Sequence, residues 1–183
     1  ALELREKFKN IKILVMGIVE ENGLLIASEN DITLTISNLN QVQNHQKLAK
    51  KLKIHLKIDS GMNRLGFKYD QDILQAVEYF RDNENFMLEG IFTHFSTADV
   101  DKSYYDIQMS RFNKVLKMID YDFHCIHVSN SSSAINYENN INFTTHVRLG
   151  ISLYGLTLDE NVNFLKTTFT LKTFISQINI LEP

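Results

Sequence analysis

The sequence predicts an α/β fold built around a parallel sheet, and three observations lead to that class. Short apolar runs alternate with longer amphipathic segments, which is typical of repeated strand–helix units. No low-complexity linker interrupts the alternation, and polar clusters follow several of the apolar runs. The chain has 183 residues, 44% hydrophobic and 22% charged, so it can form one globular domain with a sizeable core.

The elements of the first half are expected in a simple order. Residues 1–8 carry a helical pattern of apolar and charged side chains, with no capping residue before it. The apolar runs are expected to be strands at 11–16, 33–37 and 54–58. They would be connected by a helical or irregular stretch at 21–29 and by a helix at 38–52.

The second half repeats the same unit. The polar residues 59–64 are expected to form a loop, followed by helices at 70–83 and 103–119 and strands at 87–93 and 123–128. A last strand is expected around Gly150, with the segments 145–149 and 151–154 on either side of this glycine. Residues 169–181 alternate with a period of two, which predicts an antiparallel strand outside the parallel sheet.

These elements give six parallel strands joined by helices, two fewer than the eight of a (β/α)8 TIM-type barrel. The sequence therefore predicts an incomplete barrel of about six strands, lacking the first strand and most of the second unit. The opening has no initiator Met and begins inside a helical pattern, so we expect a further segment upstream.

Composition excludes several classes of function. Lys and Arg number 19 against 22 Asp and Glu, and no basic stripe is present, which argues against a nucleic-acid partner. The single cysteine, Cys125, excludes an internal disulfide and a cysteine-based zinc cluster, and its apolar run predicts a buried strand thiol. No run approaches the roughly 18 apolar residues of a membrane span, and the opening is no signal peptide. We expect a soluble, cytoplasmic protein.

Four polar clusters lie where predicted strands end, which is where the active site of such a barrel forms. The first places Lys57 inside a strand and Arg64 beyond a glycine turn. The second contains His94, and the fourth contains Arg148. The third, residues 127–134, ends a strand with small hydroxyl residues that could hold a phosphate.

Each cluster also has a purely structural interpretation. Lys57 and Asp59 could form an ion pair, His94 could be a hydrogen-bonded core residue, the serines could cap a helix, and Arg148 could be a surface cation. Structural roles of this kind would be scattered over the fold. Four clusters at the ends of four successive strands instead favour one shared site.

Three strings carry a resemblance to a known family. They are Lys-x-Asp-Ser-Gly-Met-x-Arg-Leu-Gly at 57–66, Thr-His-Phe at 93–95 and Arg-x-Gly-Ile-x-Leu-Tyr-Gly at 148–155. In this order and spacing, the chain resembles the alanine racemases, which are pyridoxal-phosphate-dependent enzymes of fold type III. The resemblance extends from residue 1 to about residue 181.

The resemblance implies both an architecture and an activity. Residues 1–157 would form part of the cofactor-binding barrel domain, and residues 158–183 would begin a C-terminal β domain. The enzyme would be an isomerase, a homodimer with shared active sites, that interconverts L-alanine and D-alanine and supplies D-alanine for the peptidoglycan of the cell wall. Its cofactor would be pyridoxal 5'-phosphate.

The resemblance also implies residue roles around the cofactor ring. Arg148 would hydrogen-bond the pyridine nitrogen, and its permanent charge would disfavour protonation of that nitrogen, which suits racemisation over transamination. His94 would pack near the ring. His127 would hydrogen-bond Arg148 and direct it, which requires a neutral imidazole with an acceptor nitrogen.

The remaining roles concern the phosphate and the substrate. Ser131 and the backbone around Gly150 and Ile151 would hold the phosphate, with Asn130 alongside. Arg64 would lie near the cofactor phenolate and the substrate carboxylate. Lys57 occupies a position that is often carbamylated in the family, giving an N-carboxylysine that orients Arg64. An unmodified Lys57 would instead have a lowered amine pKa beside Arg64.

The chain also departs from the family pattern. Family members carry a Schiff-base lysine in the first barrel strand, closely followed by a phosphate-binding tyrosine, and this chain starts after that point. The second base is a tyrosine from the partner's C-terminal domain. Because racemisation needs a base on each face of Cα, the fragment alone is expected to be inactive. Leu149 stands where many relatives have proline.

Four alternatives are weighed against this interpretation. The parent could racemise another amino acid such as serine, or the chain could be a non-catalytic barrel remnant that serves in interaction or regulation. Decarboxylation is disfavoured by Arg148, because related decarboxylases generally present an acid to the ring nitrogen. A metal site from Asp59, His94 and His127 is conceivable, but no His-x-His or His-Glu-x-x-His string accompanies them, so we expect no metal.

Overall fold

The computed structural model describes residues 1–43, 48, 50–137 and 142–180, and in these ranges it contains one five-stranded sheet. All strand pairs are parallel, and the order in space follows the order in sequence, β1-β2-β3-β4-β5. The strands are β1 Leu14–Val15, β2 Thr33–Ile36, β3 Leu52–Lys57, β4 Phe86–Phe92 and β5 Cys125–His127. Each strand end therefore lies beside the next at one edge of the sheet.

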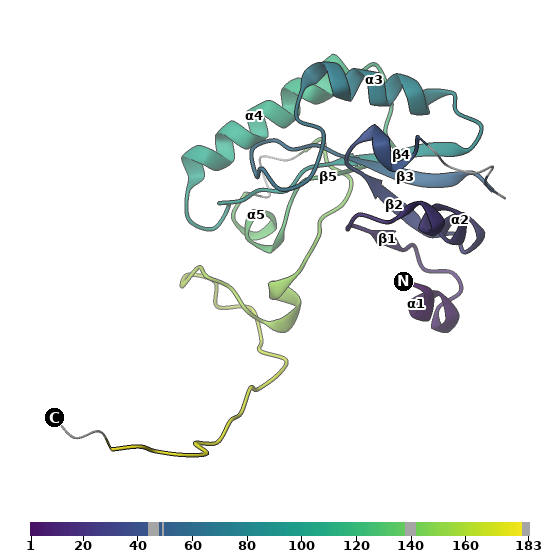
Figure 1. The fold of residues 1–183 in the computed structure, drawn as a ribbon. Coiled ribbons are helices and arrows are strands. Elements are labelled where there is room, and N and C mark those ends of the chain that lie inside the picture. Colours follow the sequence, from purple (N-terminus) through teal and green to yellow (C-terminus); the bar gives the residue numbers. More distant parts are fainter. Residues whose placement is uncertain (44–47, 49, 138–141, 181–183) are drawn as a thin grey trace.

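The helices are α1 Leu2–Lys7, α2 Glu21–Glu29, α3 Asp70–Arg81, α4 Lys102–Met118 and α5 Ser131–Asn136, with 3-10 turns η1 Leu39–Gln41 and η3 Ile151–Tyr154. Figure 1 shows α3 and α4 lying along one face of the curved sheet and leaving the opposite face uncovered by them. This arrangement is part of a TIM-type barrel, as predicted. None of the helices in the described ranges is long and apolar enough to cross a membrane.

The hydrophobic core lies between the sheet and its outer helices. In α3 the buried residues recur at helical spacing, Ile73, Val77 and Phe80, so one face of the helix packs inward. In β3, Ile54 and Leu56 are fully buried in this core. Because side chains alternate along a strand, His55 and Lys57 point to the opposite, inner face. The sheet thus separates an apolar outer layer from a polar inner one.

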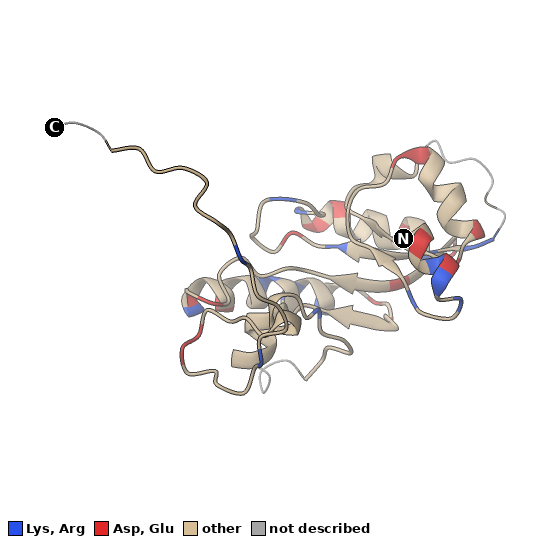
Figure 2. Ribbon diagram, turned by 90° about the horizontal axis from the view of Figure 1, so that it is seen from below, with Lys and Arg blue, Asp and Glu red and all other residues tan. Residues whose placement is uncertain are grey.

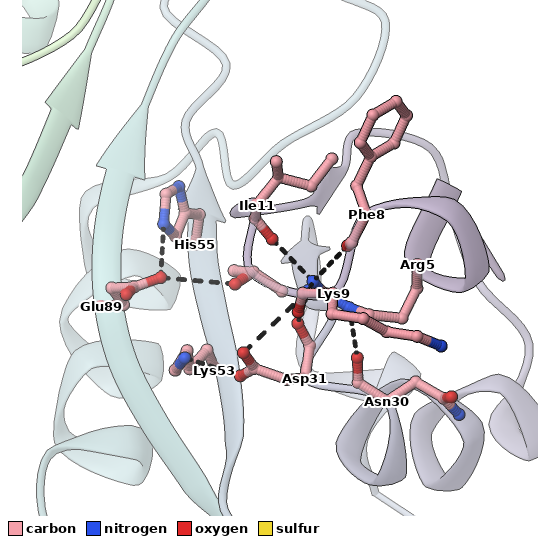
Figure 3. Close-up of polar contacts among 10 residues, drawn as sticks. Arg5, Phe8, Lys9, Ile11, Asn30, Asp31, Lys53, His55 and Glu89 are labelled. Carbon is pink, nitrogen blue, oxygen red and sulfur yellow. Dashed lines mark hydrogen bonds and ion pairs between the residues drawn. The ribbon is translucent and has the colours of Figure 1, made fainter. Parts of the chain in front are cut away.

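Arg5 ties the opening helix to the first two strands. Its buried guanidinium donates hydrogen bonds to five backbone carbonyls, those of Phe8, Lys9, Ile11, Asn30 and Asp31. Figure 3 shows these bonds converging on the Arg5 side chain beside the strands. A single cation therefore satisfies the carbonyls of two loops and fixes the start of the chain against the β1 edge.

The prediction of a helix at 38–52 is wrong for the residues of this range that the structure describes. Residues 44–47 and 49 lie outside the described residues. Only η1 and a turn follow β2, and β3 already begins at Leu52. Gln41 Oε1 accepts hydrogen bonds from the backbone N of Ser37, 2.7 Å, and from the Ser37 hydroxyl, 2.8 Å. These local side-chain bonds close a tight turn in place of a helix.

The sixth predicted strand is also absent from the described residues. His146 pairs with His127 through one isolated bridge, and residues 151–154 form η3 instead of extended structure. Gly155, with a φ of 76°, then ends this turn. The incomplete barrel is confirmed, but with five strands rather than six.

The predicted strand at 169–181 is not formed over its described part, and residue 181 lies outside that part. Leu171, Phe174 and Ile180 are 89%, 93% and 93% exposed, and no pairing involves this segment. Figure 2 shows this segment extending away from the sheet, with little of its ribbon coloured as charged residues. The period of two defines two faces, but a strand also needs a neighbour to bond with. The division into domains at residues 157 and 158 stays a prediction.

Candidate active site

The inner face of the sheet gathers polar side chains at the carboxyl ends of β3, β4 and β5. Lys57 ends β3, His94 follows β4, His127 ends β5, and Arg148 reaches them from the segment after α5. Phe92 lies among them: Lys57 Nζ is 4.8 Å and Arg148 Cζ 5.2 Å from the centroid of its ring. The four candidate residues from four separate clusters are therefore brought into one site.

Arg148 is the best-anchored residue of the site. Its Nη1 donates to His127 Nδ1, 2.6 Å, and to the His127 carbonyl, 2.8 Å. Its Nη2 donates to the carbonyls of Thr93, 2.6 Å, and Val128, 3.0 Å, and lies 3.4 Å from His94 Nδ1. The buried Nε has no partner among the described residues. A buried N–H without a partner is costly, so this donor points to a missing acceptor.

Arg148 also dominates the electrostatics of the site. Burial, and then the Arg148 charge, lower the pKa of His94 to about 4 and that of His127 to about 2. Burial, followed by Arg148 and Arg64, lowers the pKa of Lys57 to about 7. Burial lowers the pKa of Arg148 only to about 10, so it stays charged at neutral pH. The site thus combines the fixed Arg148 cation with the neutral imidazoles of His94 and His127, which suits an anionic ligand.

The loop after β3 is closed by the Asp59 carboxylate. Its Oδ1 accepts from the backbone N of Gly61 and of Asn63, both at 3.0 Å. Gly66 brings the chain back beside the strand, where Phe67 N donates to the Lys57 carbonyl at 2.8 Å. Asp59 therefore holds the loop instead of forming the ion pair with Lys57. Arg64 lies exposed in this loop.

The predicted phosphate-binding residues meet beside α5. The buried Ser131 Oγ accepts from Gly150 N, 2.8 Å, and from Ser152 N, 3.4 Å. Ile151, between these two amides, is 44% exposed. A Cβ on Gly150 would meet only that Ser131 hydroxyl, at 3.8 Å, within a 4 Å radius, so the space beside this backbone is open. Asn130 caps α5 through Ser133 N, 3.0 Å, and its side chain is already in use.

Two residues that the sequence analysis left without a role belong to the same network. His55 Nδ1 lies 2.9 Å from His127 Nε2, and His55 Nε2 lies 3.3 Å from Glu89 Oε2. His55 precedes Lys57 by two positions in one strand, so the alternation of side chains already places both on the inner face. The spacing of His55 and Lys57 could therefore have placed His55 on the inner face, whereas no sequence signal identified Glu89 on β4 as its partner.

The metal site considered from the sequence is not assembled in the described ranges. Asp59, His94 and His127 do not form a cluster of ligand atoms there; the group that does is His55, Cys125 and His127, with ligand atoms within 4.8 Å of one another. Both ring nitrogens of each histidine are already hydrogen-bonded, and the Arg148 cation is adjacent. That no metal binds stays a prediction.

Cys125 has the properties of a structural thiol. It is half-buried, and burial raises its pKa. Its Sγ lies 3.1 Å from His146 Nδ1. A raised pKa disfavours the thiolate, which is the nucleophilic form.

Comparisons with known proteins agree with this geometry. The family described as "Alanine racemase, N-terminal domain" matches residues 1–158. An alanine racemase of Lactobacillus gasseri is 40% identical over 168 residues, which cover 89% of this chain. The structure of alanine racemase from Bacillus anthracis with bound L-Ala-P superimposes with a TM-score of 0.80 at 31% identity over 93% of the chain. The histidine racemase of Leuconostoc mesenteroides superimposes with a TM-score of 0.78 at 29% identity over 85% of it.

The matched proteins are longer than this chain. The alignments cover 44% of the Lactobacillus gasseri protein, 45% of the Bacillus anthracis chain and 43% of the Leuconostoc mesenteroides chain. The chain thus spans somewhat less than half the length of these relatives.

Proposed function

Since the chain belongs to the alanine racemase N-terminal domain family, we propose that its complete protein is a pyridoxal-phosphate-dependent alanine racemase. The observation that carries this proposal is the unpartnered, buried Nε of Arg148 on the inner face of the sheet. A buried donor requires an acceptor, and the pyridine nitrogen of the cofactor is one. The proposal thus gives a ligand group to the one nitrogen of Arg148 that the described residues leave unused.

The residues present fit this cofactor at both ends. Arg148 Nε is buried and has no partner among the described residues, so it is available as a donor for the ring nitrogen. Beside an open space, the backbone N of Gly150 and of Ser152 donate to Ser131 Oγ, and a bound phosphate oxygen could replace that hydroxyl as their acceptor. Backbone amides and a hydroxyl are the groups that bind phosphate oxygens. The net positive charge from Arg148 favours the anionic phosphate further.

Pyridoxal 5'-phosphate, when bound, supplies an electron-withdrawing ring that makes the α-hydrogen of an amino acid more acidic. Arg148 stays charged at neutral pH, so a proton on the neighbouring ring nitrogen is disfavoured by like-charge repulsion. Arg148 would thereby make the bound ring a weaker electron sink, which would favour return of the proton to Cα over its transfer elsewhere.

The other residues bind and orient. His127 accepts a hydrogen bond from Arg148 through Nδ1 and so directs the guanidinium. Arg64 is proposed to hold the substrate carboxylate with its planar fork. Lys57 is proposed to orient Arg64 as a carbamate, because an amine with a pKa of about 7 is largely neutral at pH 8 and can react with carbon dioxide. His94, neutral by burial and by Arg148, is proposed to pack beside the ring.

Proton transfer on the two faces of Cα needs two groups. We propose that a cofactor-binding lysine and the partner subunit's tyrosine, both outside these 183 residues, provide them. We further propose that the protein is a homodimer in the cytoplasm and supplies D-alanine to peptidoglycan. These proposals rest on family membership, and residues 1–183 alone are then expected not to racemise.

A racemisation assay tests the function. The complete protein is incubated with pyridoxal 5'-phosphate and L-alanine, and D-alanine is measured by chiral chromatography over time, with size-exclusion chromatography and light scattering to give the oligomeric state. We expect racemisation in both directions by a dimer, and slower turnover of L-serine and L-histidine. A folded, cofactor-loaded protein that leaves alanine unchanged but racemises histidine or serine would assign another substrate; one that changes none of the three would contradict the proposed function.

A further inference from the structure

Four side chains form one continuous line of hydrogen bonds across the inner face of the sheet. Arg148 Nη1 meets His127 Nδ1 at 2.6 Å, His127 Nε2 meets His55 Nδ1 at 2.9 Å, and His55 Nε2 meets Glu89 Oε2 at 3.3 Å. Figure 3 shows the last of these contacts, with the Glu89 carboxylate directed at His55. The line joins three strands to the arginine of the site.

The bonds can run in only one direction while both imidazoles are neutral. A guanidinium only donates, so His127 Nδ1 must accept and its proton must lie on Nε2. That proton is donated to His55 Nδ1, which leaves the His55 proton on Nε2. A carboxylate only accepts, so Glu89 receives this last hydrogen bond. Burial lowers the pKa of both histidines, which keeps the rings neutral.

The backbone provides space for this contact. The register of β3 and β4 shifts between Ile54 and His55, which leaves Glu89 as the extra residue of a bulge. Bulges turn a side chain in a new direction, and here it meets His55. A Cβ on Gly90 would lie 2.8 Å from His55 Nε2, so glycine leaves room for the ring. The Thr33 hydroxyl donates to the same Glu89 oxygen at 3.4 Å.

We propose that His55 and Glu89 are positioning residues that fix the His127 tautomer and so hold the Arg148 guanidinium in place. Glu89 selects the His55 ring with its proton on Nε2. His55 in turn selects the His127 ring whose Nδ1 can accept from Arg148. This inference rests on the proposed function for its catalytic consequence, but the order of protons along the line is a property of the free protein.

Without Glu89, a second arrangement becomes accessible. His55 can then carry its proton on Nδ1, which forces His127 to carry its own on Nδ1, where it faces the Arg148 donor. Two donors facing each other do not form a hydrogen bond. Arg148 would lose one of its anchors, and its Nε would be held less firmly.

The direct test is nitrogen NMR of the complete protein labelled with [15N]histidine, without substrate or cofactor. Ring nitrogens that carry a proton and those that accept a hydrogen bond have separate chemical shifts, and replacing each histidine assigns the signals. We expect His55 and His127 both to carry the proton on Nε2. A wild-type protein with the His127 proton on Nδ1 would overturn the proposal without any variant.

Substitutions then separate positioning from packing. Glu89→Gln keeps an oxygen acceptor and should retain the Nε2 proton on His55, whereas Glu89→Leu should give a mixture of His55 tautomers. Cys125→Ala removes an inner-face side chain of β5 outside the line and is the matched control; it should leave both tautomers unchanged. The same comparison is made at His55. His55→Asn keeps an oxygen acceptor near the Nδ1 position, and His55→Leu removes it.

Kinetics of the cofactor-loaded enzyme provide the second readout. Loss of one hydrogen bond should lower kcat about threefold to tenfold in Glu89→Leu with little change in KM, and Glu89→Gln should restore most of the rate. Equal losses in Glu89→Gln and Glu89→Leu with unchanged tautomers would overturn the positioning role. If the wild type shows the expected tautomers but no racemase activity, the proposed function fails while the proton order stands.

Discussion

Lys57 is a site residue whose amine pKa the fold lowers into the neutral range. It is 7% exposed at the end of β3, beside the Phe92 ring. Burial lowers its amine pKa from 10.5 to about 7, with Arg148 and Arg64 acting in the same direction and Asp59 opposing them. At neutral pH a large share of the amine is uncharged, which is the form that carbon dioxide carbamylates.

The lowered pKa predicts a pH-dependent cost in stability. Between pH 7 and 10.5 the unfolded chain binds a proton that the folded chain does not, so stability rises with pH across this window. Below pH 7 the full cost of the buried charge remains. Lys57→Met should therefore raise the free energy of unfolding by about 4 to 5 kcal/mol at pH 6, since the pKa falls by about 3.5 units at about 1.4 kcal/mol each, and the gain should disappear by pH 10.5.

Urea unfolding of the complete, cofactor-free protein in carbonate-free buffer measures this difference across the pH range. Lys53→Met is the matched control, because Lys53 lies on the same strand and pairs with the exposed Asp31 at 2.7 Å. It should show no comparable gain at pH 6. A Lys57→Met protein that is less stable than wild type at pH 6 would contradict the buried-amine account.

For single residues, the sequence predicts those that belong to recognisable motifs, but not those whose role depends on tertiary contacts alone. Lys57, His94, His127 and Arg148 follow from strings at strand ends, and the structure gathers them. The roles of His55 and Glu89 depend on the register between β3 and β4, including its bulge. A single sequence does not specify that register, so these two residues could not be assigned.

Among the elements, the loop after β3 depends on one glycine. Gly66 has a φ of 126°, and a Cβ there would lie 2.7 Å from Asp59 N and 2.8 Å from the Lys57 carbonyl oxygen. These are backbone atoms that cannot move aside. Gly66→Ala should destabilise the protein by about 2 to 4 kcal/mol and displace the loop that carries Arg64.

Gly17→Ala is the control, because a Cβ at that position would meet nothing within 4 Å. It should change stability by less than about 0.5 kcal/mol. The denaturant midpoints of the two variants, compared with that of the wild type, measure these stability differences. Equal stabilities for both variants would show that the loop adapts and that Gly66 is not required for its closure.

The elements that the sequence predicts well have a clear period and tertiary partners. The helices α3 and α4 begin within one residue of their expected starts, and α2 occupies the stretch at 21–29 that was expected to be helical or irregular. The failures have two physical causes: residues 38–43 form local side-chain bonds, whereas residues 145–154 make only one bridge to β5 and residues 169–180 make no strand pairing among the described residues. Periodicity in the sequence defines the two faces of a segment, whereas strand formation also depends on a neighbouring strand with which the segment can hydrogen-bond.

On the scale of the whole molecule, the two faces of the curved sheet have opposite characters. The face toward α3 and α4 forms the apolar core, and the inner face carries Lys57, His127 and the Arg148 contacts. A parallel sheet with this distribution presents a polar site at the carboxyl ends of its strands. The central claim is that Arg148 Nε on this inner face is the donor for the pyridine nitrogen of the cofactor.

The most direct test compares the affinity of the complete protein for pyridoxal 5'-phosphate with its affinity for the analogue in which a C–H replaces the ring nitrogen. With a charged donor at that nitrogen, the wild type should bind the natural cofactor about tenfold to a hundredfold more tightly. Arg148→Met should reduce this ratio to one or below. A wild type with no preference, or the same ratio in both proteins, would contradict the account.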